Sequence, residues 1–382
     1  VGDIEVEMQW FTRRSGNTVV VGVDKSLEML KCCTGYWEGD RFVDRSDTLE
    51  VWAVQDGTIV RSDGNPLNAE PVIKVRGRYR DFALLETPTL GALTRSSRVA
   101  TNVYETMMAA RGKPVLFFPA RFDMHEVQAA DGYSYNIAVQ RFNMDFSHEV
   151  GPFVSTDAQG DWWGGAGGGT VAHAAIASFL GDTAEAMMQF ARVLPASIPR
   201  IALVDFNNDS VRDTLRMLAE MFRKYQELCD LGDQVEAAKY ILYGVRLDTS
   251  GSIRDVSVAP LGDAALDLGV NPRLVFNVRQ ALDAASESWD LPAAWKDAAR
   301  KYCRNVKIVV SGGFGPEKIN KFEKLGVPVD IYAVGSWLFN NNGSTVTDFT
   351  ADVVRVKVHG EWVDMAKVGR KPLDNPDLER VW

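Results

Sequence analysis

The sequence predicts an α/β protein, an irregular (β/α) barrel with a smaller α+β domain. Three observations support this. Strands and helices alternate from about residue 115 onward, the pattern of a parallel sheet with right-handed crossovers. Successive strands end in polar or small residues, as barrel strands do at the face that carries an active site. The N-terminal segment is rich in short strands, and strands return near the C-terminus. We expect residues 1–88 with 345–382 to form the α+β domain and 89–344 to form the barrel.

The composition narrows the class of protein. The chain has 382 residues and a formal net charge of −9, which argues against general nucleic-acid binding because that requires a basic surface. No apolar run approaches the roughly 20 residues of a membrane span, and no signal peptide is visible. Cys32, Cys33, Cys229 and Cys303 show no paired metal spacing, which favours free thiols in a reducing cytoplasm. We therefore expect a cytoplasmic enzyme without a nucleic-acid or membrane partner.

The N-terminal elements follow from local patterns. Residues 24–31 predict an amphipathic helix with Asp24 as its N-cap. Residues 48–54 and 58–60 flank Asp56-Gly57, a strong turn signal, and predict a β-hairpin. Residues 71–75 predict another strand.

The pattern changes at residue 81. Apolar residues recur at helical spacing through 81–111, and Lys113-Pro114 ends that predicted helix. Further strands are predicted at 115–118, 201–204, 240–247, 306–310 and 329–334, and helices at 211–228, 272–284, 292–300 and 316–325. Residues 353–363 return to strands around His359-Gly360, and we expect them to rejoin the N-terminal domain.

A glycine run precedes a histidine. Five glycines between residues 164 and 169 lead into Thr170 and His173. Glycine lacks a Cβ, so the backbone can approach a ligand closely. Thr170 could cap the next helix, which places His173 in its first turn, where anions such as phosphate bind. His173 could then act as an acid, a base or a phosphate-accepting nucleophile. The alternative is a surface loop with an incidental histidine.

Two late strands end in small residues. Gly312-Gly313 follows Ser311, and Gly335-Ser336 ends the next strand. In a barrel, the loops after these strands often bind a phosphate through backbone N–H groups, which requires that side chains be absent. The alternative is that these are ordinary turn glycines.

Charged residues end two other strands. Alternation places Arg246 and Asp248 on one face, where the arginine suits a carboxylate or phosphate and the aspartate suits ribose hydroxyls. They could instead form an ion pair that fills the barrel mouth. Asp205 could accept the Nδ1 proton of His173 and so fix its tautomer, or act only as a helix N-cap.

The first barrel strand offers an aromatic face and a cation, Phe118 and Arg121. Phe118 by itself would more often belong to the core. His125 follows closely and could line the same mouth.

These pieces occur in one order along residues 72–338. They are Gly77-Arg78-Tyr79, Glu86-Thr87, Leu90-Gly91, Phe118-Pro119-Ala120-Arg121, Ser155-Thr156-Asp157-Ala158-Gln159-Gly160, Gly169-Thr170-Val171-Ala172-His173, Leu203-Val204-Asp205, Arg246-Leu247-Asp248-Thr249, Val310-Ser311-Gly312-Gly313 and Ala333-Val334-Gly335-Ser336. Each is weak alone, but the ordered set resembles the nicotinate phosphoribosyltransferase family and the wider type II phosphoribosyltransferases, which include the nicotinamide enzyme.

The resemblance implies a reaction in NAD salvage. Nicotinate and phosphoribosyl pyrophosphate would give nicotinate mononucleotide and pyrophosphate. The leaving pyrophosphate would need Mg²⁺. ATP would be a co-substrate through a phosphohistidine at His173, which Asp205 would orient. The resemblance further implies a cytoplasmic homodimer with a shared active site.

The resemblance also assigns roles to individual residues. Phe118 would stack on the pyridine ring, and Arg121 and Arg246 would bind its carboxylate or the phosphates. Asp248 would hold the ribose hydroxyls. The matched substrate-binding positions are Phe118, Arg121, Thr156, Asp157, Thr170, Arg246 and Asp248, and the matched 5′-phosphate positions are Gly312, Gly313, Gly335 and Ser336.

Asp157 leaves the substrate open. A carboxylate beside the pyridine would accept a hydrogen bond from an amide but would repel a carboxylate. If Asp157 contacts the ring substituent, nicotinamide becomes the alternative substrate; if it faces elsewhere, nicotinate stands.

The sequence departs from the family in two places. Relatives carry, ahead of the position of Val1, a segment whose tyrosine closes the pyridine site, usually that of the partner subunit. The sequence does not contain it, so either the chain is truncated or the site is incomplete. Some relatives also have a cysteine-rich zinc module near the C-terminus, and we expect no structural zinc here.

Three further alternatives remain. Quinolinate phosphoribosyltransferase shares the fold class, but a dicarboxylate should need several cations. A catalytically weak relative could bind nucleotide as a sensor. A phosphosugar-processing barrel would use the phosphate loops without His173.

Overall fold

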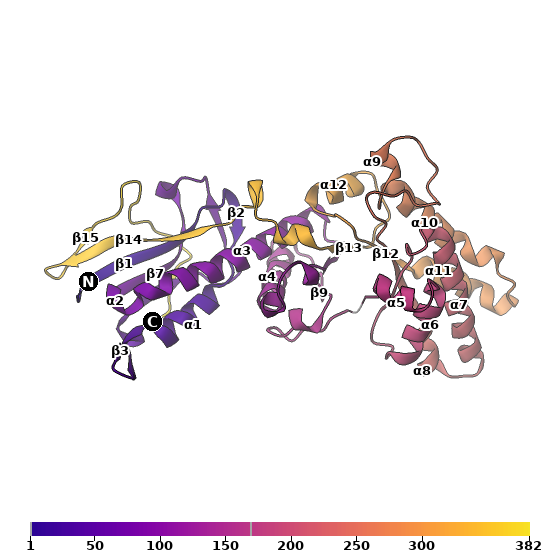
Figure 1. Cartoon of the computed structure of the whole chain (residues 1–382), viewed down its shortest axis with the longest axis horizontal. Coiled ribbons are helices and arrows are strands. Elements are labelled where there is room, and N and C mark those ends of the chain that lie inside the picture. The colour runs from indigo at the N-terminus through magenta and orange to yellow at the C-terminus, as the bar shows by residue number, and fades with distance from the viewer. Residues whose placement is uncertain (1, 169) are drawn as a thin grey trace. The chain divides into compact units, whose positions relative to one another are not determined.

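The structure, a computed structural model, describes residues 2–168 and 170–382. Contacts within the chain divide it into two compact units (Figure 1). Unit 1 comprises Val1–Glu105, Ala130–Glu149 and Leu338–Trp382, and unit 2 comprises Thr106–Ala129 and Val150–Trp337. The predicted fold class, an α/β protein with an irregular (β/α) barrel and a smaller α+β domain, is confirmed, with the barrel present as a half-barrel. The domain boundaries at residues 88 and 344 stay predictions.

Unit 1 is built on a six-stranded antiparallel sheet with one apolar face. Its strands follow the order β15 (Glu361–Asp364), β14 (Phe349–Val358), β1 (Glu5–Thr12), β7 (Pro71–Arg78), β5 (Glu50–Ala53) and β16 (Glu379–Arg380). Val6, Met8 and Trp10 alternate along β1 into a core with residues of α1 (Val23–Cys33), α2 (Tyr79–Phe82) and α3 (Glu86–Ala109). The pairing of β14 with β1 confirms that the C-terminal strands rejoin the N-terminal segment.

The opposite face of this sheet carries a row of alternating charge. Cross-strand neighbours run Asp364, Arg355, Glu7, Arg76 and Glu50. Glu7 is buried and takes 2.9 Å and 2.7 Å contacts from Arg355 Nη1 and Arg76 Nε. Opposite charges directly across a sheet stabilise the pairing, so this face is ordered by ion pairs rather than by apolar packing.

The hairpin predicted around Asp56-Gly57 is wrong. β5 pairs with β7 and β16, whereas β6 (Ile59–Ser62) pairs with β2 (Gly16–Val19) in a separate sheet. The turn exists, but its two strands go to different partners. Asp56 instead accepts a 2.8 Å hydrogen bond from the Val23 N–H at the start of α1.

The cap predicted for α1 is also wrong. Its N-cap is Gly22, whose φ of 100° is in the left-handed region, and Asp24 lies in the first turn. The carboxylate that satisfies the helix start comes from Asp56, distant in sequence.

Unit 2 contains six parallel strands. Their order is β10 (Arg200–Leu203), β11 (Leu242–Leu247), β12 (Lys307–Val310), β13 (Ile331–Val334), β8 (Val115–Phe117) and β9 (Phe153–Val154). No pairing between β9 and β10 closes the sheet within the described residues, so it forms a half-barrel. The carboxyl ends of all six strands therefore lie at one edge.

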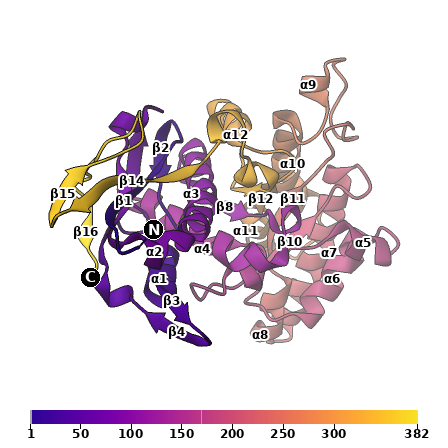
Figure 2. The ribbon, with the colours of Figure 1, turned by 60° about the vertical axis from the view of Figure 1, so that its left-hand side comes forward.

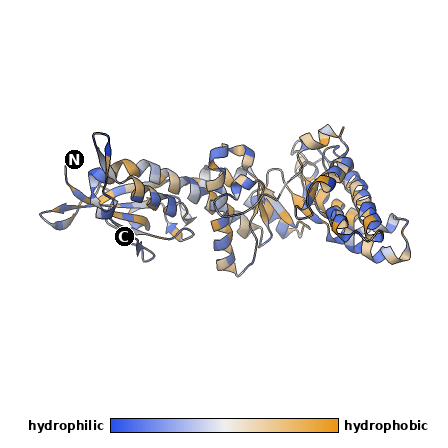
Figure 3. Cartoon of the chain, turned by 90° about the horizontal axis from the view of Figure 1, so that it is seen from below, coloured by the Kyte–Doolittle hydropathy of each residue, from blue (hydrophilic) through white to orange (hydrophobic). Residues whose placement is uncertain are grey.

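Helices connect and cover these strands. They are α6 (Thr183–Val193), α7 (Ser210–Asp230), α10 (Pro272–Ala284), α11 (Lys296–Asn305) and α12 (Pro316–Lys324), with α6 against β10 and α7 against β11 (Figure 2). Hydrophilic and hydrophobic positions alternate along the helices, as in amphipathic elements (Figure 3). Within residues 2–168 and 170–382, no helix has both the length and the apolar character needed to cross a membrane.

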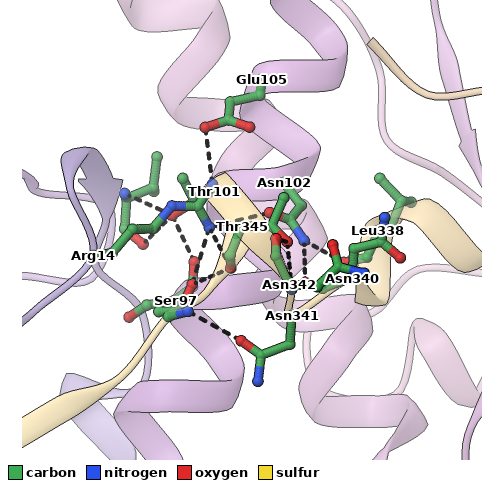
Figure 4. Close-up of polar contacts among 12 residues, drawn as sticks. Arg14, Ser97, Thr101, Asn102, Glu105, Leu338, Asn340, Asn341, Asn342 and Thr345 are labelled. Carbon is green, nitrogen blue, oxygen red and sulfur yellow. Dashed lines mark hydrogen bonds and ion pairs between the residues drawn. The ribbon is translucent and has the colours of Figure 1, made fainter. Parts of the chain in front are cut away.

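A buried arginine joins three segments of unit 1 (Figure 4). Arg14, 2% exposed, follows β1. It donates to Asn102 Oδ1 (3.1 Å) and Glu105 Oε1 (2.9 Å) on α3, and to Thr347 Oγ1 (3.0 Å) ahead of β14. The amide of Asn102 in turn donates to the carbonyl of Leu338 at 3.1 Å. Because the Arg14 guanidinium is buried, its charge must be stabilised by hydrogen bonds from within the protein. The packing of these three segments therefore depends on its partners.

We predict unequal effects for the two ends of this ion pair. Arg14→Met should lower the free energy of unfolding of the chain by about 2–4 kcal/mol, because it leaves several polar groups unpaired. Glu105→Gln should cost less, about 0.5–1.5 kcal/mol, because the amide still accepts a hydrogen bond and residue 105 reaches water. Urea unfolding of both variants measures the difference. Equal losses would contradict the assignment of Arg14 as the central residue.

Candidate active site

A cavity of about 480 Å³ lies at the carboxyl edge of the parallel sheet in unit 2. Segments after five of the six strands contribute to it, together with the segment that enters the short helix α5 (His173–Ser178). The predicted site residues that line it are Phe118, Arg121, Thr156, Thr170, His173, Arg246, Asp248, Gly312, Gly313, Gly335 and Ser336. Topology therefore gathers residues that are spread over more than two hundred positions of sequence.

Arg246 is the central polar residue of this cavity and is 4% exposed. Its Nη1 lies 3.1 Å from Asp248 Oδ2 and donates to Ser311 Oγ, also at 3.1 Å. Its Nη2 donates to the carbonyl of Val171 at 2.9 Å. Its guanidinium carbon lies 5.3 Å from the centre of the Phe118 ring, a cation–π distance. The sequence left open whether Arg246 and Asp248 face a ligand or form an ion pair at the barrel mouth. In the structure they form an ion pair, and both residues line the cavity.

Asp248 is held from two sides. Ser311 Oγ donates to Asp248 Oδ1 at 2.7 Å while Arg246 contacts the other oxygen. The carboxylate is therefore held in one orientation and is still partly exposed, and Asp248 lines the cavity. Sequence reasoning gave Ser311 no role of its own, although its position directly before the glycine pair was a signal.

Arg121 differs from Arg246 in being available. It is exposed, lies 5.2 Å from the Phe122 ring, and has no ion pair with any other described residue. An uncommitted guanidinium at a cavity wall can take a carboxylate in a bidentate contact. His125, in contrast, is exposed on a neighbouring turn and does not line the cavity.

His173 and Asp205 meet, but through the other ring nitrogen. His173 Nε2 lies 3.1 Å and 3.2 Å from the two oxygens of Asp205, so the expected Nδ1 contact is wrong. The aspartate side chain is 7% exposed and the histidine side chain 47%. Burial raises the pKa of Asp205, and the adjacent His173 opposes that shift. With Nε2 directed to the carboxylate, Nδ1 is the nitrogen left to react.

The predicted helix start is only partly right. His173 does lie in the first turn of α5, but the N-cap residue is Ala172 and not Thr170. Thr170 instead lines the cavity.

The glycine run packs against protein rather than against a ligand. A Cβ on Gly168 would lie 1.9 Å from the Phe153 ring, and one on Gly167 would lie 2.9 Å from the Thr156 backbone. Gly168 N–H donates to the carbonyl of Val154 at 2.8 Å, which holds the run beside β9. None of the described glycines in the run lines the cavity, and Gly169 lies outside the described residues. The expectation of a ligand-contacting glycine loop is therefore wrong for Gly164 to Gly168.

Asp157 contacts the glycine run and does not line the cavity. Its carboxylate is exposed and accepts a 2.7 Å hydrogen bond from the Gly167 N–H. It therefore holds the glycine run through this hydrogen bond.

The two strand ends with small residues, Gly312-Gly313 and Gly335-Ser336, do line the cavity. Gly312 and Gly313 have φ of 86° and 69°, in the left-handed region that glycine tolerates. A Cβ on Gly335 would lie 2.8 Å from the Phe122 ring. An anion site built on backbone N–H groups requires small residues at such positions.

A metal site made by protein ligands alone is absent from the described chain. No three His, Cys, Asp or Glu side chains within it come together in a way that could hold a metal ion.

The fold and cavity define a class: a parallel half-barrel protein with an aromatic–arginine wall, a polar strand end and a small-residue anion site. The family described as quinolinate phosphoribosyl transferase, N-terminal domain, matches residues 1–97. The chain is 28% identical over 210 residues to nicotinate phosphoribosyltransferase pncB2 of Mycobacterium tuberculosis, covering 53% of this chain and 40% of that protein. It thus spans less than half the length of that relative.

Two solved structures are also similar. The nicotinate-nucleotide pyrophosphorylase from Pyrococcus furiosus has a TM-score of 0.64 and 26% identity, over 96% of this chain and 73% of that one. Human nicotinic acid phosphoribosyltransferase has a TM-score of 0.57 and 17% identity, over 93% and 71%, which is a likeness of fold. Together, the family match and these similar proteins support the type II phosphoribosyltransferase family.

We predict that the glycine run depends on packing space. Gly168→Ala should lower the free energy of unfolding by about 1–3 kcal/mol, because the methyl group would collide with Phe153. Gly151→Ala is the matched control, since a Cβ there meets nothing within 4 Å and its φ is not positive; it should change stability by less than about 0.5 kcal/mol. Thermal unfolding of both variants measures this, and a Gly168→Ala protein as stable as wild type would refute the packing role.

Proposed function

We propose that the chain is a nicotinate phosphoribosyltransferase acting in NAD salvage. The pyridine nitrogen of nicotinate would attack C1′ of phosphoribosyl pyrophosphate; the N–C1′ bond forms, the C1′–O bond breaks, and pyrophosphate leaves with the electron pair. The observation that carries this proposal is a single cavity with a stacked Phe118–Arg246 wall, an oriented Asp248 and two glycine-bearing strand ends.

The choice of nicotinate rests on two residues. Arg121, which has no ion pair with another described residue, lines the same cavity as Phe118, on whose ring a pyridine would stack. Asp157, the group that would favour an amide and repel a carboxylate, is directed to Gly167. This arrangement supports nicotinate over nicotinamide, and it makes Arg121 rather than Arg246 the carboxylate receptor.

The ribosyl half of the cavity would hold phosphoribosyl pyrophosphate. Asp248 would accept hydrogen bonds from the ribose hydroxyls, and Gly312, Gly313, Gly335 and Ser336 would hold the 5′-phosphate. An oxocarbenium-like centre is helped mainly by positioning and charge. Mg²⁺ commonly enters such sites on substrate phosphates with few protein ligands. It would neutralise the leaving pyrophosphate.

ATP would act through His173. Asp205 would hold the Nε2 proton, orient the ring and stabilise the positive charge of a phosphorylated imidazole. Nδ1 would then accept the phosphoryl group, in place of the nitrogen expected from sequence.

We also propose a homodimer with a shared site. Unit 2 exposes Met124, Trp162 and Leu180, of which Leu180 is 98% exposed. Exposed apolar side chains of this size would be stabilised where a protein partner covers them.

Quinolinate is the second candidate substrate, because the matched N-terminal family is that of quinolinate phosphoribosyl transferase. Against it, the described cavity lining has only two arginines and no lysine, and Arg246 is already engaged. A dicarboxylate would leave one charge poorly paired.

The test is product formation from phosphoribosyl pyrophosphate and Mg²⁺ with nicotinate, nicotinamide and quinolinate in parallel, with and without ATP. We expect nicotinate to be used and ATP to stimulate the reaction. His173→Ala should lose the ATP stimulation and keep the basal rate. Arg121→Gln should raise KM for nicotinate about 10- to 100-fold, the loss of one charge-assisted contact.

Arg192→Gln is the control for Arg121, since Arg192 is exposed on α6 and remote from the cavity lining. Turnover of nicotinamide or quinolinate alone would overturn the substrate. Unchanged ATP stimulation in His173→Ala would overturn the phosphohistidine.

A further inference from the structure

A lysine lies directly behind the glycine pair at the end of β12. Lys318, in the first turn of α12, donates from Nζ to the carbonyl of Gly312 at 3.2 Å. The same Nζ lies 4.1 Å from the centre of the Phe314 ring and 5.9 Å from that of Phe322. No carboxylate pairs with this ammonium in the described part of the chain. Its partners are thus one carbonyl and two aromatic faces.

The contact with Gly312 has a geometric consequence. In a trans peptide, the carbonyl of one residue and the N–H of the next point in opposite directions. Holding the Gly312 carbonyl toward Lys318 therefore turns the Gly313 N–H the other way. Gly312 and Gly313 line the cavity and Lys318 does not. We therefore infer that the Gly313 N–H points toward the cavity.

The Gly312–Gly313 peptide needs a restraint such as this hydrogen bond. Both glycines have positive φ, and glycine has the widest range of accessible backbone conformations, so this turn has little conformational restraint of its own. A positively charged donor on the carbonyl also polarises the peptide and strengthens its N–H as a donor.

We propose that Lys318 is a positioning residue for the anion site, which orients the Gly312–Gly313 peptide so that its N–H meets the 5′-phosphate of the substrate. This inference rests on the proposed function and names a residue that neither the motifs nor the cavity lining includes. Lys318 acts through the loop and does not touch the phosphate.

The charge on Lys318 changes near neutral pH. Burial, with a smaller contribution from Lys321 on the same helix, lowers the pKa of Lys318 to about 8. On the loop side, Asp248 lies beside Gly312 and is held by Arg246 and Ser311. As pH rises through this pKa, the ammonium becomes an amine and the hold on the carbonyl weakens.

The test is equilibrium binding of ribose 5-phosphate, followed by calorimetry between pH 7 and 9, with ribose as the phosphate-free control. The second pKa of a phosphate is about 6, so the ligand charge stays constant over this range. Wild-type affinity should fall about 3- to 10-fold from pH 7 to 9, the loss of one charge-assisted contact. Lys318→Gln should bind about tenfold more weakly at pH 7 and show no such fall.

Two further variants make the test specific. Lys318→Arg keeps a permanent charge that can stack on Phe314, so it should hold wild-type affinity at pH 7 and lose the fall toward pH 9. Lys324→Gln removes an exposed charge at the other end of α12 and should behave as wild type.

The outcomes separate the inference from the proposed function. If wild type binds ribose 5-phosphate and Lys318→Gln binds it equally at every pH, the role of Lys318 is wrong and the phosphate site stands. If wild type does not bind ribose 5-phosphate better than ribose, the phosphate site and the inference both fail. Circular dichroism and thermal unfolding of Lys318→Gln, expected to match wild type, exclude loss of affinity by misfolding.

Discussion

The ion pair of Arg246 with Asp248 is the interaction on which the site of unit 2 depends. A buried guanidinium is stable only when its donors are satisfied, and here the carboxylate, the hydroxyl of Ser311, the carbonyl of Val171 and the ring of Phe118 do this together. These partners stand directly after β8, β11 and β12 and in the segment before α5. One side chain therefore contacts the aromatic wall, the carboxylate of Asp248 and the segment that leads to His173.

Glycine has two different uses around this cavity. Between residues 164 and 168 it removes side-chain bulk so that a loop can lie against Phe153, Thr156 and Trp163. At residues 312 and 313 it permits positive φ at positions that line the cavity. The first use is structural; the second suits an anion. A glycine-rich sequence does not distinguish these uses, because composition is the same in both and only the neighbouring atoms differ.

Substrate choice in this family is a question of charge placement. Nicotinate, nicotinamide and quinolinate share a pyridine ring and differ in their substituents, so a stacking wall alone would treat them alike. Discrimination has to come from charged groups at the rim of the ring, since a desolvated carboxylate needs a cation and is repelled by a second carboxylate. Under the proposed function, specificity would rest on the exposed Arg121, the engagement of Arg246 and the hydrogen bond of Asp157 with Gly167. All three concern contacts rather than residue types.

The sequence by itself determined the alternation of strands and helices, the helix over 272–284, and the strand ends at which Phe118, Asp248 and Gly312 stand. These follow from periodicity and punctuation, which act over a few residues. Only the tertiary structure decided that β5 and β6, on either side of Asp56-Gly57, pair with different strands. It also decided that His173 contacts Asp205 through Nε2, that Asp157 accepts a hydrogen bond from Gly167, and that Lys318 donates one to Gly312. Each of these contacts depends on which atoms the folded chain brings together. A local sequence pattern does not specify the hydrogen-bond partner, because the same side chain can bond to any of several groups.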